Sequence, residues 1–471
     1  MWRWPVSWSG HGTARPLDSC HLYTSCITMH MAPPASIDLH NTYPGGRWKA
    51  WLAWSMPALF FLYEFMIRVT PGVIEGQLQQ QFNTTPGDLG LQMSMYYYAY
   101  APMQLVVGII LDRFGGRGPM AIAAMICGAG CLLFAVSQSI GGLGGARFLM
   151  GFGSAFAYVG TVYVAAIWFP GRRIALLSGV TAALGMLGAI SAEALLGLLL
   201  ELVSWKQAFD IFAVAAVIIA GLMWLMVPRS PEWYLSQVAE EQKAHGSGLL
   251  SGFKFVIRNR QTWLLAIVTA LIYLPIGTFA ALWGVRYLEV VMGFATDAAA
   301  PAVSLMFLGL GVIGPLIGWH SDVICQRAIY LKIGVVLALV CSGGLLLLPS
   351  GIDWVVYVLL FLLGGSAGTI VVAFPLAMEH NPCNCRGTAM TFVNFLQMIF
   401  AGVGQWVVGI LLDTTSDDGT HLKSVDPTDF RVAFLILPGC LLAGLVVVFF
   451  LKDAPRTVHH ESAVDSAPLA D

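Results

Sequence analysis

The chain has 471 residues, of which 57% are hydrophobic and 11% are charged. Soluble domains carry about 25% charged residues, so this composition indicates a protein that lies in a lipid bilayer, and the long apolar runs described below predict that it is all-α. A net charge of −2 excludes a nucleic-acid partner, because binding to phosphate requires a basic surface. The nine cysteines are scattered and no set of Cys and His has metal-ligand spacing, so we expect no metal and no cofactor.

The chain begins and ends with polar segments. Residues 1–47 mix Trp, Pro, Ser and His without an apolar run, which predicts a disordered tail rather than a signal peptide. A start codon upstream of the true one, with translation beginning at Met29 or Met31, explains the segment equally well. Residues 453–471 are predicted to form a loose C-terminal tail.

Between these segments the sequence predicts twelve membrane-spanning helices. A spanning helix requires roughly 20 apolar residues, because hydrocarbon offers the backbone no hydrogen-bond partners. Twelve runs meet this condition, near residues 51–70, 88–111, 119–138, 143–167, 175–200, 207–227, 263–283, 301–319, 328–348, 354–377, 388–412 and 431–451. The polar segment 228–262 is a predicted cytoplasmic linker, so six spans fall in an N-terminal half (48–227) and six in a C-terminal half (263–452).

The distribution of basic residues predicts the orientation. If the N-terminus is cytoplasmic, 18 of the 24 Lys and Arg residues fall on the cytoplasmic side and four on the other. Cytoplasmic loops carry an excess of basic residues, so we expect both termini in the cytoplasm.

Two polar loops occupy equivalent places in the two halves. The first, between spans two and three, carries Gly108, Asp112, Arg113, Gly115 and Arg117. The second, between spans eight and nine, repeats the Gly-x-x-x-Asp spacing with Gly318 and Asp322 but lacks the following arginine. These loops are predicted to form ion pairs at helix ends, with Gly108 allowing close packing, and to act as a cytoplasmic gate.

These motifs resemble those of the major facilitator superfamily. The first loop is similar to the loop signature of that family, and Arg147-x-x-x-Gly151-x-Gly153 and Trp205-Lys-Gln-Ala-Phe209 are similar to two further family motifs. The resemblance implies a monomeric carrier whose halves rock about a central site. Segment 63–71 with segment 87–118 resembles the anion–cation symporter branch, except that Ile67 stands where that branch has an acidic residue. Residues 147–169 also resemble bacterial amino-acid transporters and lysosomal dipeptide carriers.

Four ionisable residues within the spans are candidates for binding substrate or protons, since charge in a membrane is costly and usually functional. Glu64 and Arg68 share one helical face, so Arg68 is a candidate clamp for a carboxylate and Glu64 a candidate site for an ammonium group or proton. The alternative is a permanent ion pair near the outer interface, with Arg68 reaching lipid headgroups. Glu193 is a candidate proton carrier or a partly exposed rim residue, and Arg147 is a candidate coupling residue or an interface anchor.

Uncharged polar side chains complete the candidate site. Tyr97 and Tyr100 are three residues apart and share a face of span two, where they line a central cavity or simply pack. In the second half the candidates are Tyr273, Asn394 and Gln397, which bind substrate or join helices by hydrogen bonds.

Together these features predict a secondary transporter that takes up a small carboxylate-bearing metabolite, such as an amino acid, short peptide or organic anion, together with protons. The alternatives are a drug/proton antiporter and a non-transporting membrane sensor on the same fold. No catalytic or nucleotide-binding motif indicates an enzyme. We expect a bacterial inner membrane as the location.

Overall fold

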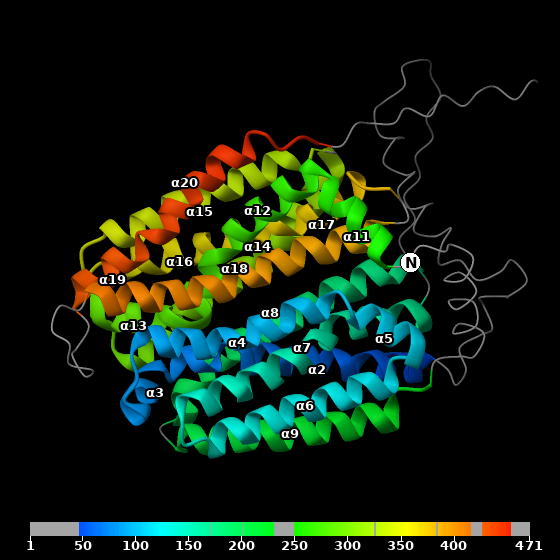
Figure 1. The fold of residues 1–471 in the computed structure, drawn as a ribbon, viewed down its shortest axis with the longest axis horizontal. Coiled ribbons are helices and arrows are strands. Elements are labelled where there is room, and N and C mark those ends of the chain that lie inside the picture. Colours follow the sequence, from blue (N-terminus) through cyan, green and yellow to red (C-terminus); the bar gives the residue numbers. More distant parts are fainter. Residues whose placement is uncertain are drawn as a thin grey trace, which may run out of the picture.

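The computed structural model describes residues 47–169, 171–200, 202–229, 249–324, 326–382, 385–415 and 426–453. The predicted tails, apart from residue 47 and residue 453, and most of the predicted linker lie outside these residues. Throughout the described part the secondary structure is helical, and it contains no strand. Both halves are bundles whose long helices run nearly parallel to one another (Figure 1).

The N-terminal half contains eight helices, two of which are short. They are α2 (Arg47–Val73), α3 (Glu75–Phe82), α4 (Pro86–Gln104), α5 (Val107–Phe114), α6 (Arg117–Val136), α7 (Ile140–Trp168), α8 (Gly171–Leu200) and α9 (Trp205–Met226).

The C-terminal half follows α11 (Leu249–Arg258) and contains more interruptions. Its elements are α12 (Arg260–Leu274), the π-helix η1 (Pro275–Trp283), α13 (Gly284–Tyr287), η2 (Leu288–Met292), α14 (Thr296–Ile324), α15 (Ala328–Leu347), α16 (Asp353–Gly368), η3 (Thr369–Val372), α17 (Ala373–Glu379), α18 (Arg386–Thr415), α19 (Pro427–Phe434) and α20 (Ile436–Val448). Helix breaks of this kind are tolerated in membranes where neighbouring helices satisfy the freed backbone groups.

Eleven helices or helix runs in the described part are long and apolar enough to cross a membrane. The second predicted span, 88–111, is the exception, because tyrosines and glutamines reduce the hydropathy of α4 and the helix is interrupted at residues 105–106 before α5 begins. It nevertheless lies packed among the others, between α7 and α18. The bundle therefore has the twelve-helix architecture that the sequence predicts.

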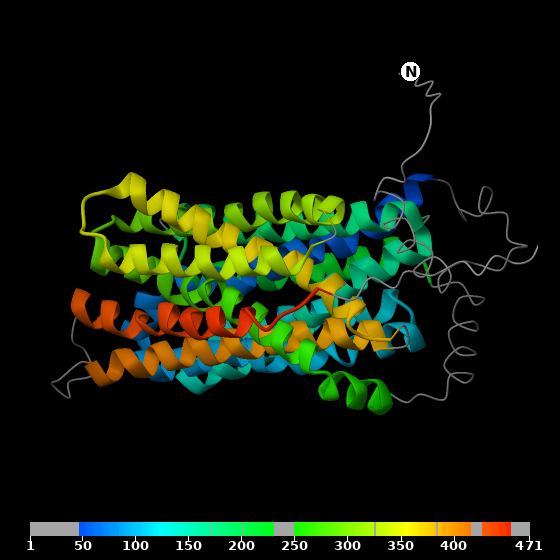
Figure 2. The same ribbon diagram turned by 90° about the horizontal axis from the view of Figure 1, so that it is seen from above.

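The two halves lie side by side, with α4 and α8 of the first half against the second (Figure 1). Helix α4 packs on α18, α8 on α14, and α2 on η1. Small residues make these approaches possible, as at Gly90, where a Cβ would stand 2.6 Å from the backbone oxygen of Gln405. Seen from above, the long helices still run along one common direction (Figure 2).

Candidate functional site

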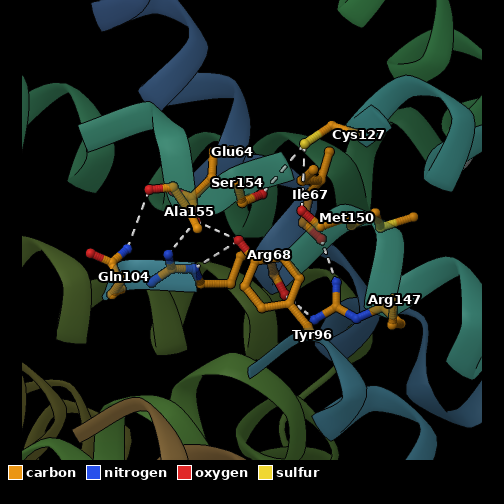
Figure 3. A network of polar contacts seen from close by, with 10 residues as sticks. All are labelled: Glu64, Ile67, Arg68, Tyr96, Gln104, Cys127, Arg147, Met150, Ser154 and Ala155. Carbon is orange, nitrogen blue, oxygen red and sulfur yellow. Dashed lines mark hydrogen bonds and ion pairs between the residues drawn. The ribbon is translucent and has the colours of Figure 1, made fainter. Parts of the chain in front are cut away.

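A buried ion pair lies on α2 of the N-terminal half. Glu64 and Arg68, one turn apart on α2, are 0% and 3% exposed, and Arg68 Nη2 is paired with Glu64 Oε1. The Tyr96 hydroxyl of α4 donates to the same Glu64 oxygen and accepts from Arg68 Nε at 3.3 Å (Figure 3). The predicted shared face of α2 is therefore present. The alternative in which Arg68 reaches lipid headgroups is wrong, because its side chain is enclosed by protein.

Aromatic rings enclose the Arg68 guanidinium. Its carbon lies 4.4 Å from the ring centroid of Phe65, 4.9 Å from that of Tyr100 and 5.4 Å from that of Tyr96. Cation–π attraction at such distances stabilises a desolvated cation by about 2 kcal/mol or more. These rings therefore offset part of the cost of burying the charged Arg68 side chain away from water.

Arg147 of α7 fixes the backbone beside this pair. Its Nη1 donates to the Ile67 oxygen at 2.8 Å, its Nη2 donates to the Arg68 oxygen at 3.1 Å, and its guanidinium lies 4.5 Å from the Tyr96 ring centroid (Figure 3). With 1% exposure it is not the interface anchor that the sequence left open. Its contacts hold α7 to α2 and set the position from which the Arg68 side chain extends.

Three predicted tyrosines lie near the pair, in different ways. Tyr100 stacks on Tyr96 with ring centroids 6.0 Å apart, and Tyr273 of α12 lies close enough to Arg68 to interact with it from the other half. Tyr97 is fully buried, and its hydroxyl has no hydrogen-bond partner among the described residues. The sequence-based prediction named Tyr97 and Tyr100 but not Tyr96, which is the tyrosine that hydrogen-bonds both members of the pair. Tyr96 and Tyr100 are four residues apart and therefore also share a helical face.

The remaining candidates do not join the network. Asn394 is half-buried and Gln397 is buried, and neither hydrogen-bonds Arg68 or Glu64 in the part of the chain that the structure describes. Glu193 of α8 is 1% exposed, and its Oε2 has no hydrogen-bond partner among the described residues. It is therefore a buried carboxyl rather than a partly exposed rim residue, and within the described part of the chain it forms no ion pair with Arg68.

The residues of the first polar loop lie at the end of α5 and the start of α6. Gly115 ends α5 with a φ of 74°, a conformation that favours glycine. Arg117 lies over the Trp224 ring at 4.6 Å, and burial raises the pKa of the half-buried Asp112 carboxyl. Neither residue forms an ion pair with another described residue.

The second polar loop is tied together by a residue outside its predicted pattern. Arg327 pairs with Asp322 at 3.1 Å and with Glu379 of α17 at 3.0 Å. Asp453 accepts hydrogen bonds from the backbone N–H groups of Arg327 and Ala328, both at 2.8 Å. The second loop has no arginine directly after Asp322. In the folded protein Arg327 takes its place as the ion-pair partner of Asp322.

Helices α3 and α13 mark one end of the bundle, which we call the α3/α13 end (Figure 1). There Asp413 of α18 accepts a hydrogen bond from Thr85 Oγ1 at 2.9 Å and another from the Gly87 backbone N–H at 3.0 Å. A Cβ at Gly87 would stand 2.3 Å from Asp413 Oδ2, so glycine leaves room for the carboxylate. Asp413 therefore caps α4 of the opposite half, a contact that the sequence did not predict.

Toward the opposite end of the bundle, several glycines lie in open space. Gly108 of α5, Gly179 of α8 and Gly387 of α18 all face open space, with no atom within 4 Å of a Cβ built on them. The close packing expected at Gly108 is therefore wrong for this conformation. The glycines at which the halves approach most closely, Gly87, Gly90 and Gly409, lie toward the α3/α13 end.

Comparison with known proteins gives the family. The family model described as Major Facilitator Superfamily matches residues 58–405. The chain is 26% identical over 442 residues to the hexuronate transporter of Escherichia coli strain K12, covering 88% of this chain and 98% of that one. It is 27% identical over 408 residues to an MFS-type efflux pump of Mycolicibacterium smegmatis, covering 82% and 90% of the two chains.

The same fold occurs in a solved transporter. A bacterial homologue of the human lysosomal transporter Spinster, in an inward-facing and unoccupied conformation, superposes with a TM-score of 0.70 at 13% identity, covering 86% of this chain and 98% of that one. At that identity the likeness concerns the fold alone. With a family model that covers most of the chain, twelve helices and matching loop motifs, the chain belongs to the major facilitator superfamily and is a multi-pass membrane transporter rather than an enzyme.

Proposed function

We propose that the protein takes up a small organic anion of the sugar-acid type together with protons. The observation that carries this proposal is the buried network of Glu64, Arg68 and Tyr96, which Tyr273 approaches from the other half. The planar guanidinium of arginine matches a carboxylate, and the aromatic rings around it suit the carbon skeleton of a sugar acid. The relative named a hexuronate transporter supports the same substrate class.

Coupling to protons follows from the competition between two carboxylates for one guanidinium. While Glu64 is ionised, it neutralises Arg68 and occupies the position that a substrate carboxylate would take. Protonation of Glu64 removes this competitor and leaves a buried cation, which an anion then stabilises. Anion and proton therefore bind together more favourably than either binds alone.

The proposed orientation places both termini in the cytoplasm of a bacterial cell. It rests on the excess of Lys and Arg on that side. The α3/α13 end then faces outward, and the structure corresponds to a carrier closed to the outside. Labelling of intact cells by an impermeant maleimide at Gln77→Cys, an exposed position on α3, tests this orientation. Labelling only after cell lysis would show that α3 faces the cytoplasm and would contradict the proposed orientation.

Uptake into proteoliposomes tests the function. With pH 7.5 inside and pH 5.5 outside, we expect uptake of radiolabelled D-glucuronate and D-galacturonate above its equilibrium level, and a protonophore should abolish this accumulation. D-Glucose, which lacks the carboxylate, is the matched control and should not accumulate. Arg68→Ala should reduce uptake at least about 30-fold, because truncating one partner of a buried charge pair costs about 2–5 kcal/mol of binding free energy.

The Glu64→Gln variant separates binding from coupling. We expect it to exchange external for internal sugar acid but not to accumulate it in response to the proton gradient, because its side chain cannot ionise. Accumulation equal to that of the unmodified protein would contradict the role of Glu64.

Efflux of a cationic compound is the second candidate function. It is supported by the relative named an efflux pump and by Glu193, whose buried carboxyl would pair with a cation. A panel of amino acids, dipeptides, sugar acids and organic cations in the same vesicles distinguishes the candidates. Export of cations that is lost in Glu193→Gln, without uptake of any acid, would replace the proposed function. Binding of a ligand without any flux would instead indicate a sensor.

A further inference from the structure

An acidic side chain that the proposed transport cycle does not yet use lies at the α3/α13 end. Glu75 stands in the first turn of α3, is 2% exposed, and has an Oε2 without a hydrogen-bond partner among the described residues. Just before it in sequence, a Cβ at Gly72 would stand 3.1 Å from the backbone oxygen of Ala281 in η1. Glu75 is thus buried where the first half meets the second.

The charged groups that act on Glu75 both belong to the opposite half. They are Arg286 of α13 and Glu289 of η2, which pair with each other at 3.2 Å. Arg286 Nη1 lies 4.0 Å from the position that a Cβ would take on Gly76, the residue next to Glu75. Arg286 is therefore near Glu75 but is bonded to an acid of its own half.

We propose that Glu75 is a proton-binding residue of a gate at the α3/α13 end, and that its protonated form keeps this end closed. The inference rests on the alternating access of the proposed function. Opening the gate would separate α3 from α13 and expose the Glu75 carboxyl to water, where it ionises readily. Closing the gate would return the carboxyl to a site that offers Oε2 no hydrogen bond, so the neutral form is favoured there.

The sign of the pH dependence follows from these two environments. Burial raises the pKa of Glu75 from 4.5 to about 7 in the closed state, an effect that Arg286 opposes and Glu289 reinforces. Because the closed state binds the proton more tightly, a fall in pH from 7 to 4.5 increasingly favours the closed state. Above pH 7 Glu75 is ionised in both states, so protonation no longer stabilises the closed state. The ratio of closed to open molecules should rise roughly 70-fold between pH 8 and pH 5, if the open state has the ordinary pKa of a glutamate.

Spin-label distances across the gate test the proposal without any substrate. Cysteines introduced at Gln77 and Ala295, both exposed and on opposite halves at this end, would carry the labels in a background whose accessible natural cysteines are replaced by serine. In the unmodified site we expect the short-distance fraction to grow as pH falls from 8 to 5. In Glu75→Gln, which resembles the protonated acid, we expect that fraction to be high at every pH and to vary by less than about threefold.

Glu289→Gln is the matched control from the same cluster. It removes the acid that competes for Arg286, so Glu75 should keep its pH response but with a midpoint at lower pH. A Glu75→Gln variant that keeps the unmodified pH response would overturn the proposal. So would distances in the unmodified site that do not change between pH 8 and pH 5.

The two proposals fail in different ways. A gate that responds to pH through Glu75 in a protein that moves no sugar acid would leave this inference standing and refute the proposed substrate. Proton-driven uptake of sugar acid, together with a Glu75→Gln variant that keeps the pH response of the unmodified protein, would support the proposed substrate and refute the role of Glu75.

Discussion

The buried charges of Glu64 and Arg68 depend on hydrogen bonds with a single hydroxyl group, that of Tyr96. Glu64 and Arg68 could pair on any isolated helix, where an exposed pair four residues apart stabilises by about 0.2–0.5 kcal/mol. In the folded protein the pair is removed from water, and the Tyr96 hydroxyl supplies hydrogen bonds to both partners. Such added hydrogen bonds are what make a buried ion pair tolerable.

The hydroxyl of Tyr96 should therefore matter more than that of its neighbour. Tyr96→Phe leaves Glu64 and Arg68 each short of a hydrogen bond, and we expect it to lower the free energy of unfolding by about 1–3 kcal/mol. Tyr97→Phe is the control, because the Tyr97 ring is equally buried but its hydroxyl has no hydrogen-bond partner among the described residues. Thermal unfolding of both purified variants measures the difference. Equal free energies of unfolding for the two variants would show that the hydrogen bonds of the Tyr96 hydroxyl do not stabilise the protein.

At several positions in this bundle, glycine allows two helices to approach more closely than a residue with a side chain would permit. Gly151, part of the sequence motif that begins at Arg147, lies against α4, where a Cβ would stand 2.0 Å from the Tyr96 backbone oxygen. This contact brings α7 close enough to α4 for Arg147 to lie over the Tyr96 ring. A motif that the sequence offers only as a family signature thus has a packing role in the candidate site.

Substitution by alanine at two glycines of α7 tests this role. Gly151→Ala forces α7 and α4 apart, and such overpacking typically lowers stability by about 1–3 kcal/mol. Gly145→Ala on the same helix meets open space, and alanine favours a helix by about 1 kcal/mol over glycine, so it should be neutral or stabilising. Thermal unfolding is again the measurement, and uptake by Gly151→Ala should fall with it. A Gly151→Ala protein as stable as Gly145→Ala would contradict the close approach.

On the scale of the whole molecule, the balance between conformations depends on contacts that cross between the halves. Asp413 binds Thr85 and the backbone of Gly87, and both hydrogen bonds must break if the α3/α13 end is to open. Hydrogen bonds to a charged group contribute about 1.5–3 kcal/mol, which is a substantial part of the energy difference between two conformations of a carrier.

Loss of this cap should shift the conformational balance. For Asp413→Ala we expect the closed population to fall by about 10- to 100-fold relative to the open one, measured with the spin labels at Gln77 and Ala295. Asp426→Ala is the control at the same end, because Asp426 caps α19 within its own half and crosses no interface. An equal shift in both variants would mean that the Asp413 contact does not hold the halves together.

The sequence by itself determined the twelve-helix bundle, its loop motifs and the shared face of Glu64 and Arg68 on α2. Each of these depends on residues close together in the chain, since an apolar run of 20 residues or a spacing of four expresses itself within one helix. Only the tertiary structure decided that Tyr96 completes the pair, that Arg327 ties the second loop, that Asp413 caps α4 and that Glu75 is buried. These depend on how distant segments pack, as with Thr85 and Asp413, 328 positions apart, and no local pattern specifies which side chain will face which across such a gap.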